Sequence, residues 1–286
     1  MKYVIDSKTL AFSGKGVKPL FKTLNEVCQQ KNTDFLVVGA FARDIILHNI
    51  FGRPAGVLTK DIDFGMIFSQ WKEFQELADD LTQNHGFVKG QFPHVFVSPD
   101  GLPTDLLPFG EVENNRAISF PEADNFSINM MGFAEAWETR LTIVLDGEQV
   151  FSIPTPEGLI LLKLIAWNDR TPSDVALKHV TDISLIIDSY FDARADELDQ
   201  RSEFANLYDL SGDSFNMNWY AAVAIGRIIG QMVQPFPETR RTLLEIFSKV
   251  LAEKTGAFFR RRMTNVLRED DTVVAGIIER LQKELA

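Results

Sequence analysis

Residues 35–64 read FLVVGAFARDIILHNIFGRPAGVLTKDIDF, and this stretch decides the fold. It begins with an apolar run, residues 35–38, that predicts a short buried strand. Gly39 interrupts the run with a residue that tolerates any backbone angle, and a helix is expected over residues 40–51 because apolar side chains recur there at helical spacing. The stretch therefore predicts a strand, a tight turn and a helix, and then a loop that leads to a second strand.

The second strand carries two acids on one side. In Asp61-Ile62-Asp63-Phe64, charged and apolar residues alternate, so a strand projects both carboxylates from the same face. Carboxylates side by side repel each other unless a hard divalent cation such as Mg²⁺ or Mn²⁺ neutralises them. A solvated strand edge or a helix-capping Asp also explains an isolated D-x-D, but the preceding glycine turn favours a metal site.

The turn at Gly39 offers a site for an anion. A helix that starts there presents free backbone N–H groups and the positive end of its dipole, and Arg43 follows one turn later. We therefore expect Gly39, Ala40 and Arg43 to contact the phosphates of a nucleotide that faces the metal.

A third acid follows in a predicted hairpin. Ser98-Pro99-Asp100-Gly101 suits a type I turn between strands at residues 92–97 and 102–109, and the return strand carries Asp105 among apolar residues. If this strand pairs beside Asp61 and Asp63, Asp105 completes a carboxylate cluster that can hold one or two metal ions. The alternative is an ordinary Asp at a strand edge.

Composition is that of a soluble globular protein. The chain has 286 residues, of which 45% are hydrophobic and 24% charged, and no apolar run reaches the roughly 20 residues that span a membrane. A single cysteine and the lack of an export signal predict a cytoplasmic location. The net charge of −11 argues against a surface devoted to nucleic acid.

The two halves of the chain differ in pattern. Hairpins and short strands end near residue 153, and beyond it strong apolar stripes predict helices over 156–167, 173–190, 194–207, 216–233, 237–254, 256–268 and 271–285. We predict an α+β fold with a mixed β-sheet and flanking helices in residues 1–153, followed by an α-helical domain in residues 154–286. Residues 111–131 show little periodicity and predict a loop.

Four residues of the helical half are candidates for nucleotide contact. Lys163 lies inside an apolar helix, where it either extends to the surface or reaches a buried anion such as a triphosphate. Arg170 follows two helical turns later. Lys178 and Asp182 are one turn apart, and Asp182 either holds a basic side chain in place or forms an ordinary i, i+4 pair.

Other chemistries lack support. The four histidines do not have the spacing of zinc ligands, and no G-x-S-x-G element marks a serine hydrolase. The carboxylates indicate attack by a hydroxyl group on a nucleoside triphosphate such as ATP, with metal ions that bridge the phosphates.

These residues resemble the nucleotidyltransferase superfamily with the DNA-polymerase-beta-like fold, and most closely its AbiEii-type toxin branch. The resemblance implies that Asp61 and Asp63 bind metal, that Asp105 completes the site, that Gly39 shapes the phosphate turn and that Lys163 contacts nucleotide. It is carried by Val38-Gly39-Ala40, Ala42-Arg43-Asp44, Thr59-Lys60-Asp61-Ile62-Asp63-Phe64, Thr104-Asp105-Leu106-Leu107, Pro154-Thr155-Pro156-Glu157, the segment from Lys163 to Arg170, and Lys178-His-Val-Thr-Asp182-Ile183.

Two departures from the family pattern stand out. Ala40 replaces the usual Gly or Ser, which removes a hydroxyl contact to phosphate, and His179 stands where the toxin branch tends to have an acid. The Arg43-Asp44 pair also resembles transfer-RNA CCA-adding enzymes.

The resulting hypothesis is a metal-dependent nucleotidyltransferase with substrate in the cleft between its domains. The acceptor is an RNA end, a protein or a small molecule, and a toxin-like role implies an antitoxin as partner. The alternatives are a CCA-adding-like RNA nucleotidyltransferase and a catalytically inactive binding module that keeps the fold.

Overall fold

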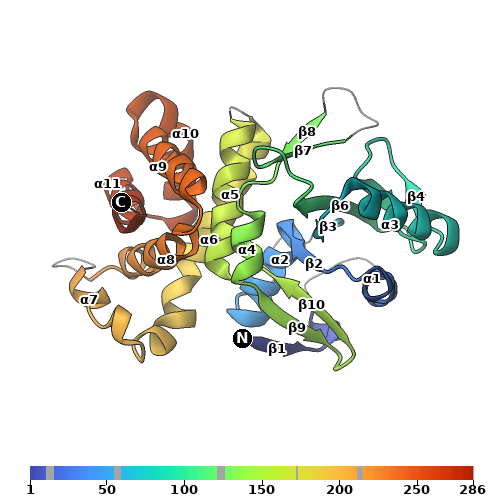
Figure 1. Cartoon of the computed structure of the whole chain (residues 1–286). Coiled ribbons are helices and arrows are strands. Elements are labelled where there is room, and N and C mark those ends of the chain that lie inside the picture. Colours follow the sequence, from blue (N-terminus) through green and yellow to red (C-terminus); the bar gives the residue numbers. More distant parts are fainter. Residues whose placement is uncertain (11–15, 55–58, 121–125, 172, 211–214, 286) are drawn as a thin grey trace. The chain divides into compact units, whose positions relative to one another are not determined.

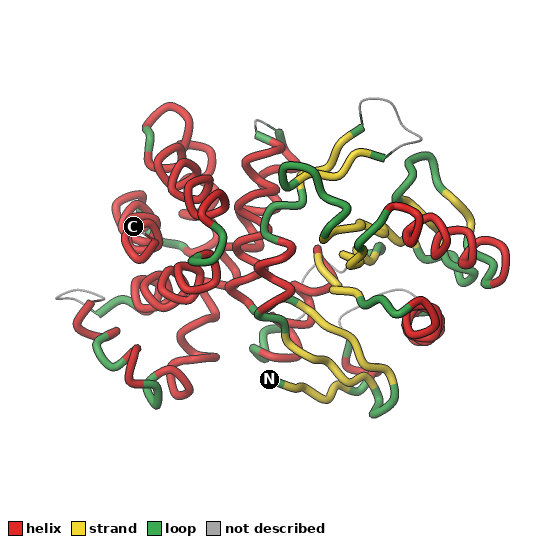
Figure 2. Tube along the Cα trace, in the orientation of Figure 1, coloured by secondary structure: helices red, strands yellow, loops and turns green. Residues whose placement is uncertain are grey.

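A mixed eight-stranded sheet forms the centre of the N-terminal part of the chain (Figures 1 and 2). Most neighbours in it are antiparallel, but β1 with β9, β10 with β2 and β3 with β6 run parallel. Across the sheet the order is β1 (Lys2–Ile5), β9 (Leu141–Leu145), β10 (Gln149–Ile153), β2 (Phe35–Val38), β3 (Ile62–Phe68), β6 (Pro103–Gly110), β5 (Val95–Val97) and β4 (Val88–Lys89). The predicted mixed sheet is confirmed.

The computed structural model describes residues 1–10, 16–54, 59–120, 126–171, 173–210 and 215–285. The chain divides into a sheet-containing unit, Met1–Ile50 with Pro54–Thr155, and a helical unit, Phe51–Arg53 with Pro156–Ala286.

Buried and partly exposed side chains alternate along β3, so one face of the sheet is covered by helices and the other is more open to solvent. In β3, Ile62, Phe64 and Met66 are fully buried. Phe64 lies against Phe21 of α1 (Val17–Lys31), and α3 (Trp71–Asn84) packs beside α1. Asp63 alternates with these residues and therefore belongs to the other face. Farther along that face, Phe133 of α4 (Phe133–Glu138) lies over Gly65, where an added Cβ would come within 2.8 Å of its ring.

Two parts of this unit differ from the sequence prediction. The segment expected to be a loop contains a small two-stranded sheet, β7 (Ala117–Ser119) with β8 (Ser127–Asn129), whose strands are too short to show a periodicity. The helix expected over residues 40–51 is α2 (Gly39–Asp44), which continues into a π-helix, η2 (Ile45–Ile50). No residue type announces a π-helix in advance.

The helical unit is built on two long helices that pack against each other. α5 (Pro156–Arg170) packs on α6 (Asp174–Leu198), and α6 joins two helices that the sequence pattern separates, because no Gly or Pro interrupts residues 190–194. The remaining elements are η3 (Ser202–Phe204), α7 (Leu207–Leu210), α8 (Met217–Val233), α9 (Pro237–Leu251), α10 (Glu253–Leu267) and α11 (Asp271–Leu285). Among the described residues, no helix is both long and apolar enough to span a membrane.

Glycines set the spacing of α8 and α11. A Cβ on Gly226 would lie 3.0 Å from the carbonyl oxygen of Leu281, and a Cβ on Gly230 would lie 2.8 Å from that of Glu284. Because the two glycines are one turn apart, they form a flat strip on which α11 packs closely.

Candidate active site

The turn after β2 brings the backbone against an acid of the neighbouring strand. Val38 pairs with Asp63 across the antiparallel β2–β3 ladder, and Gly39 follows with a φ of 67°. A Cβ on Gly39 would lie 1.8 Å from Oδ2 of Asp63. Glycine is therefore required here for two reasons. Its φ is in the left-handed region, and the Asp63 carboxylate occupies the space that a side chain would need.

The parallel β3–β6 ladder brings a second acid beside Asp63. Asp63 and Asp105 are register partners, so their side chains leave the same face of the sheet from adjacent strands. Asp61 precedes β3 by one residue, and its Oδ1 accepts a hydrogen bond from Oγ1 of the buried Thr59. The structure therefore supplies the strand pairing on which the predicted role of Asp105 depends.

The surroundings of Asp105 perturb its ionisation. Burial raises the pKa of the Asp105 carboxyl above its ordinary value of 3.8, and the nearby charge of Asp61 raises it further. The side chain of Asp105 is 35% exposed, so solvent and ligands still reach it. The electrostatic effect of Asp61 indicates that the two carboxylates share one region.

The donor set of these acids suits a hard cation. Three carboxylates supply the oxygen ligands that Mg²⁺ and Mn²⁺ prefer, and Asp63 and Asp105 start from adjacent positions of one sheet face. In the described part of the chain, however, no three His, Cys, Asp or Glu side chains are arranged as a metal-binding group. The residues fit a divalent cation in type and placement, and ligation requires their side chains to turn toward a common point.

The other predicted phosphate contacts of this unit are held close to the turn. Ala40 is half-buried in the first turn of α2. Arg43 donates from Nε and Nη2 to Oδ1 of the adjacent Asp44, at 2.8 and 2.6 Å. The pair is mostly buried, with side-chain exposures of 16% and 10%. This contact fixes the guanidinium within the turn rather than leaving it extended into solvent.

In the helical unit, Lys163 reaches a buried anion that belongs to the protein itself. Its Nζ donates to Oδ2 of Asp182 at 2.5 Å, and the two side chains are only 7% and 8% exposed. Asp182 thus holds a basic side chain in place, but that side chain is Lys163. Arg170 and Lys178 are exposed at the surface of the same unit.

His179 lies next to this pair and is perturbed by it. Desolvation lowers the pKa of His179 to about 4, and the positive charges of Lys163 and Arg170 add to the effect. Both ring nitrogens are buried and have no hydrogen-bond partner among the described residues. The residue that replaces an acid of the family pattern is therefore neutral at physiological pH.

Sequence reasoning missed His94 and gave no role to Thr59. His94 Nε2 lies 3.9 Å from Oδ2 of Asp105, and burial lowers its pKa. Its position follows from the β5–β6 pairing, in which Val95 lies opposite Asp105. The only available signal was the predicted hairpin, which places His94 and Asp105 on adjacent strands.

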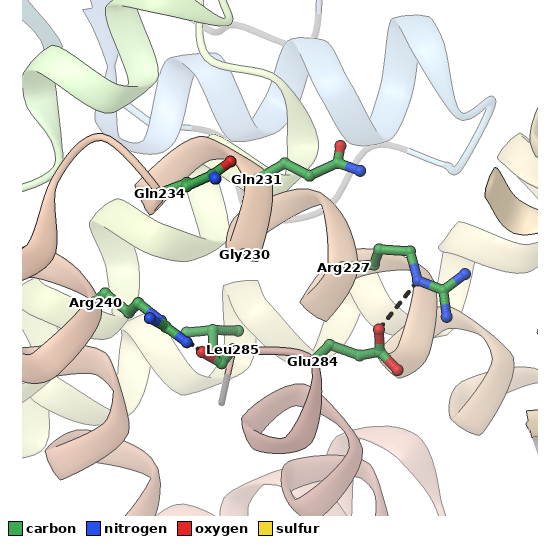
Figure 3. A pocket seen from close by; sticks show the side chains of 7 residues that line it. All are labelled: Arg227, Gly230, Gln231, Gln234, Arg240, Glu284 and Leu285. Carbon is green, nitrogen blue, oxygen red and sulfur yellow. Dashed lines mark hydrogen bonds and ion pairs between the residues drawn. The ribbon is translucent and has the colours of Figure 1, made fainter.

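Pockets of the helical unit involve other residues. One of about 320 Å³ lies at α8, α9 and α11 (Figure 3) and is lined by Arg227, Gly230, Gln231, Gln234, Arg240, Glu284 and Leu285. Internal contacts already engage its cations: Arg227 Nε lies 3.0 Å from Glu284 Oε2, and Arg240 Nε donates to the carbonyl oxygen of Leu285 at 2.7 Å. None of the predicted site residues lines it.

The fold and the family together identify the class of protein. A mixed sheet that carries acids on neighbouring strands beside a glycine turn, followed by helices, is the arrangement of a nucleotidyltransferase, and this protein is one. More narrowly, the chain belongs to the AbiEii family: the family described as "Nucleotidyl transferase AbiEii toxin, Type IV TA system" matches residues 22–275. The resemblance seen in the sequence motifs is confirmed.

Solved structures with similarity to the chain are distant. An antigenic nucleotidyltransferase-like protein from Paracoccidioides brasiliensis has 16% identity and a TM-score of 0.41 over 70% of this chain and 92% of that chain. ANT(2'')-Ia in complex with adenylyl-2''-tobramycin has 16% identity and a TM-score of 0.38 over 63% and 92%. The Thermotoga maritima CCA-adding enzyme complexed with tRNA has 12% identity and a TM-score of 0.26 over 97% and 83%. No curated protein matches at a significant level.

Proposed function

We propose that this nucleotidyltransferase moves a nucleoside monophosphate from a nucleoside triphosphate to a hydroxyl of its acceptor, in a reaction that depends on Mg²⁺ or Mn²⁺. The observation that carries the proposal is the placement of Asp63, which pairs in register with Asp105 while its carboxylate lies against the Gly39 bend. Asp61, Asp63 and Asp105 are the proposed metal ligands. Bound metal would neutralise the phosphates and lower the barrier to loss of pyrophosphate.

The protein's own groups position the reactants and accept a proton. The acceptor oxygen forms a bond to the α-phosphorus, the bond from that phosphorus to the bridging oxygen breaks, and pyrophosphate departs with the electron pair. The acceptor's proton passes to a carboxylate oxygen of Asp105, which remains 35% exposed and lies in register beside Asp63. The backbone N–H of Ala40, in the first turn of α2, is the proposed donor to phosphate oxygens.

We propose different roles for the remaining residues that were predicted to bind nucleotide. Arg43 contributes positive charge from a fixed position beside Asp44. Arg170 and Lys178 are exposed cations that suit phosphate contacts. The buried Lys163–Asp182 pair supports the helices that carry them, and any contact from Lys163 to nucleotide requires this pair to open.

Membership of the AbiEii family supports a toxin–antitoxin setting for the proposed activity. In such a setting, transfer to a cellular acceptor would inhibit growth and an antitoxin would counter it. A catalytically inactive binding module is the rival from another class, and the Ala40 departure is the observation that favours it. A CCA-adding-like enzyme is the second enzymatic candidate, favoured by Arg43-Asp44.

The deciding experiment uses nucleoside triphosphates labelled at the α-phosphate, Mg²⁺, and pools of cellular RNA and protein. We expect label in an acceptor with the wild-type protein and none with Asp63→Asn. Asp79→Asn is the matched control, because Asp79 is an exposed acid of the same unit whose carboxylate forms a surface pair with Lys89 at 3.2 Å. Equal labelling by wild type and Asp63→Asn contradicts the assignment, and no labelling by either supports the binding module. Preference for CTP and ATP with transfer-RNA ends supports the CCA-type enzyme.

A further inference from the structure

An exposed aromatic residue of α10 is surrounded by cations. Phe258 is 70% exposed, although burial of its ring would be favourable. Lys254 precedes it by four residues, and Arg261 and Arg262 follow it by three and four, so all four residues share one face of the helix. The three cations are exposed, and none of them forms an ion pair with the described residues. We call Lys254, Phe258, Arg261 and Arg262 the basic face.

A pocket of the helical unit adjoins the basic face. It has a volume of about 540 Å³, and its lining includes Trp167, Asp174, Leu177, Lys249, Lys254 and Phe258. Lys249 Nζ lies 5.1 Å from the centre of the Trp167 ring and donates to Oδ1 of Asn168 at 3.1 Å, so its charge is held at the wall of the pocket. The described lining residues include two lysines and a single acid, Asp174. This surface suits an anionic partner that also brings apolar side chains.

The C-terminal end of α6 carries the opposite charge beside exposed rings. Asp192, Asp196 and Asp199 recur there at helical spacing, and all three are exposed. The hydroxyl of Tyr208 donates to Oδ2 of Asp199 at 2.8 Å, and Phe215 stacks on Tyr208 at 5.5 Å. The two rings are 45% and 47% exposed. We call these three acids and two rings the acidic face.

The cations near the acidic face already have partners. Arg194, Arg201 and Arg227 each form an ion pair with a glutamate of the helical unit, at 2.6 to 3.0 Å. Asp192 and Asp196, in contrast, form no ion pair with the described residues. The acidic face therefore keeps charge that the described part of its own unit does not neutralise.

The two faces are too far apart to neutralise each other within one molecule. Arg262 Nε donates to Oγ1 of Thr181 at 2.8 Å, which places the basic face beside the N-terminal half of α6. Asp192 and Asp199 lie about 17 and 27 Å farther along the helix axis than Thr181. Salt screens exposed charges beyond about 10 Å at 0.1 M. Figure 1 shows α10 and α7 at opposite ends of the helical unit.

Both faces nevertheless belong to one side of α6. Asp192 and Asp199 follow Thr181 by about three and five full helical turns, so the two acids project in nearly the direction of Thr181. Between the faces, Asp188 is paired with Arg53 at 2.7 Å. A second copy, turned about a two-fold axis that crosses this side perpendicular to α6, would bring each basic face opposite an acidic face. The two contacts are then equivalent, and the assembly closes at two subunits.

We infer that the chain forms a dimer in which the basic face of each copy binds the acidic face of the other. Three cations then meet three carboxylates in each contact, and the rings of the acidic face lie against Phe258 and the adjoining pocket. The charge complementarity selects a second copy as the occupant, because the chain itself supplies a surface that combines acids with exposed rings. The inference is independent of the proposed nucleotidyl transfer, so either can fail without the other.

The first test measures the mass of the full chain in solution. Sedimentation velocity over a wide concentration range should detect a species of about 65 kDa at low salt, twice the 32.3 kDa of one chain. The dimer should dissociate more readily at high salt, because the charges at its contacts are then screened. A monomer at every concentration in low salt overturns the inference, even if that monomer binds RNA or an acidic peptide through α10.

The second test exchanges the charges of the two faces. Lys254→Glu with Arg261→Glu reverses the basic face, and Asp192→Lys with Asp196→Lys reverses the acidic face. Each double variant alone should sediment as a monomer where the wild-type protein is dimeric. A mixture of the two should dimerise again, because the two reversed faces match each other and so do the two unchanged faces. This recovery also shows that both variants are folded. A dimer of either variant alone, or a mixture that stays monomeric, overturns the inference.

Matched controls lie in the sheet-containing unit. Lys22→Glu with Lys72→Glu alters the net charge by the same amount at side chains that are 66% and 80% exposed, and the dimer should persist. Phe258→Ala should raise the dissociation constant of the dimer about tenfold or more, because an aromatic residue at the centre of an interface often dominates binding. Phe92→Ala, which removes a ring that is 46% exposed, should leave it unchanged. Equal dissociation constants for wild type and Phe258→Ala overturn the inference.

Discussion

Replacing Gly39 by alanine tests whether the Gly39 bend and Asp63 act as one unit. The residue has a φ of 67°, a left-handed conformation that costs a non-glycine residue about 1–2 kcal/mol. The new Cβ would also lie 1.8 Å from Oδ2 of Asp63, whereas real Cβ contacts are essentially never below 3.0 Å. The carboxylate or the turn must therefore shift by at least about 1.2 Å.

The chain provides a control with the same backbone strain and no collision. Gly147, in the turn between β9 and β10, has a φ of 76°, and a Cβ there would meet nothing within 4 Å. Both Gly39→Ala and Gly147→Ala should lower the free energy of unfolding by about 1–2 kcal/mol through strain alone. Only Gly39→Ala should also lower kcat, by about a hundredfold, because a displacement of about 1 Å at a reacting group costs that much.

The assay follows pyrophosphate release during nucleotide transfer, alongside denaturant unfolding of each variant. A hundredfold loss of kcat corresponds to about 2.7 kcal/mol of activation free energy. The kcat of Gly147→Ala, in contrast, should stay within about twofold of the wild-type value, so the two variants are easily distinguished. If folded Gly39→Ala protein retains the activity of Gly147→Ala, the contact between Gly39 and Asp63 has no catalytic role and the site assignment is wrong.

Three further predictions concern buried and perturbed charges. The pKa of Asp105 in the folded protein is raised above 3.8, so the stability that protonated Asp105 contributes is lost as pH rises through that pKa. Asp105→Asn should therefore raise the free energy of unfolding of the metal-free protein at neutral pH, as measured by denaturant unfolding. The same change should abolish nucleotide transfer. Lys163→Met should cost about 3–5 kcal/mol of unfolding free energy, because the buried Asp182 carboxylate loses its ion pair with Lys163. Lys72→Met, which removes an exposed pair on α3, should cost less than about 0.5 kcal/mol. The pKa of His179 is lowered from 6.5 to about 4 in the folded protein, so the stability that neutral His179 contributes is present above pH 6.5 and is lost as pH falls toward 4. In His179→Gln, the free energy of unfolding should therefore change less with pH between 4 and 6.5 than it does in the wild-type protein.

The central part of the fold could be predicted because its signals are local. A four-residue apolar run, a glycine and an alternating D-I-D-F each restrict the conformation of their own segment, and β2, the Gly39 turn and β3 follow from them. Pairing of the strand that carries Asp105 was a weaker inference, since a sequence does not state which strands are neighbours. The parallel β3–β6 ladder now supplies that information.

The parts that the sequence did not predict depend on partners far away in the chain. Lys163 lies in an apolar helix, and its environment is set by an acid 19 residues later on the next helix. Spacing alone instead suggested Lys178 as the partner of Asp182, because the two are one helical turn apart. The structure leaves Lys178 exposed and buries Asp182, so the pair forms across two helices rather than along one.

That arrangement changes how the family motif is understood in this protein. If the motif lysine were held ready for nucleotide, it would need an exposed ammonium group, but Lys163 has a side-chain exposure of 7% and a charged partner at 2.5 Å. A buried pair resists separation because each charge then loses its compensation. Lys163 therefore contributes first to the rigidity of α5 against α6, and the exposed Arg170 and Lys178 remain the cations of the motif that can meet a phosphate without disturbing the core.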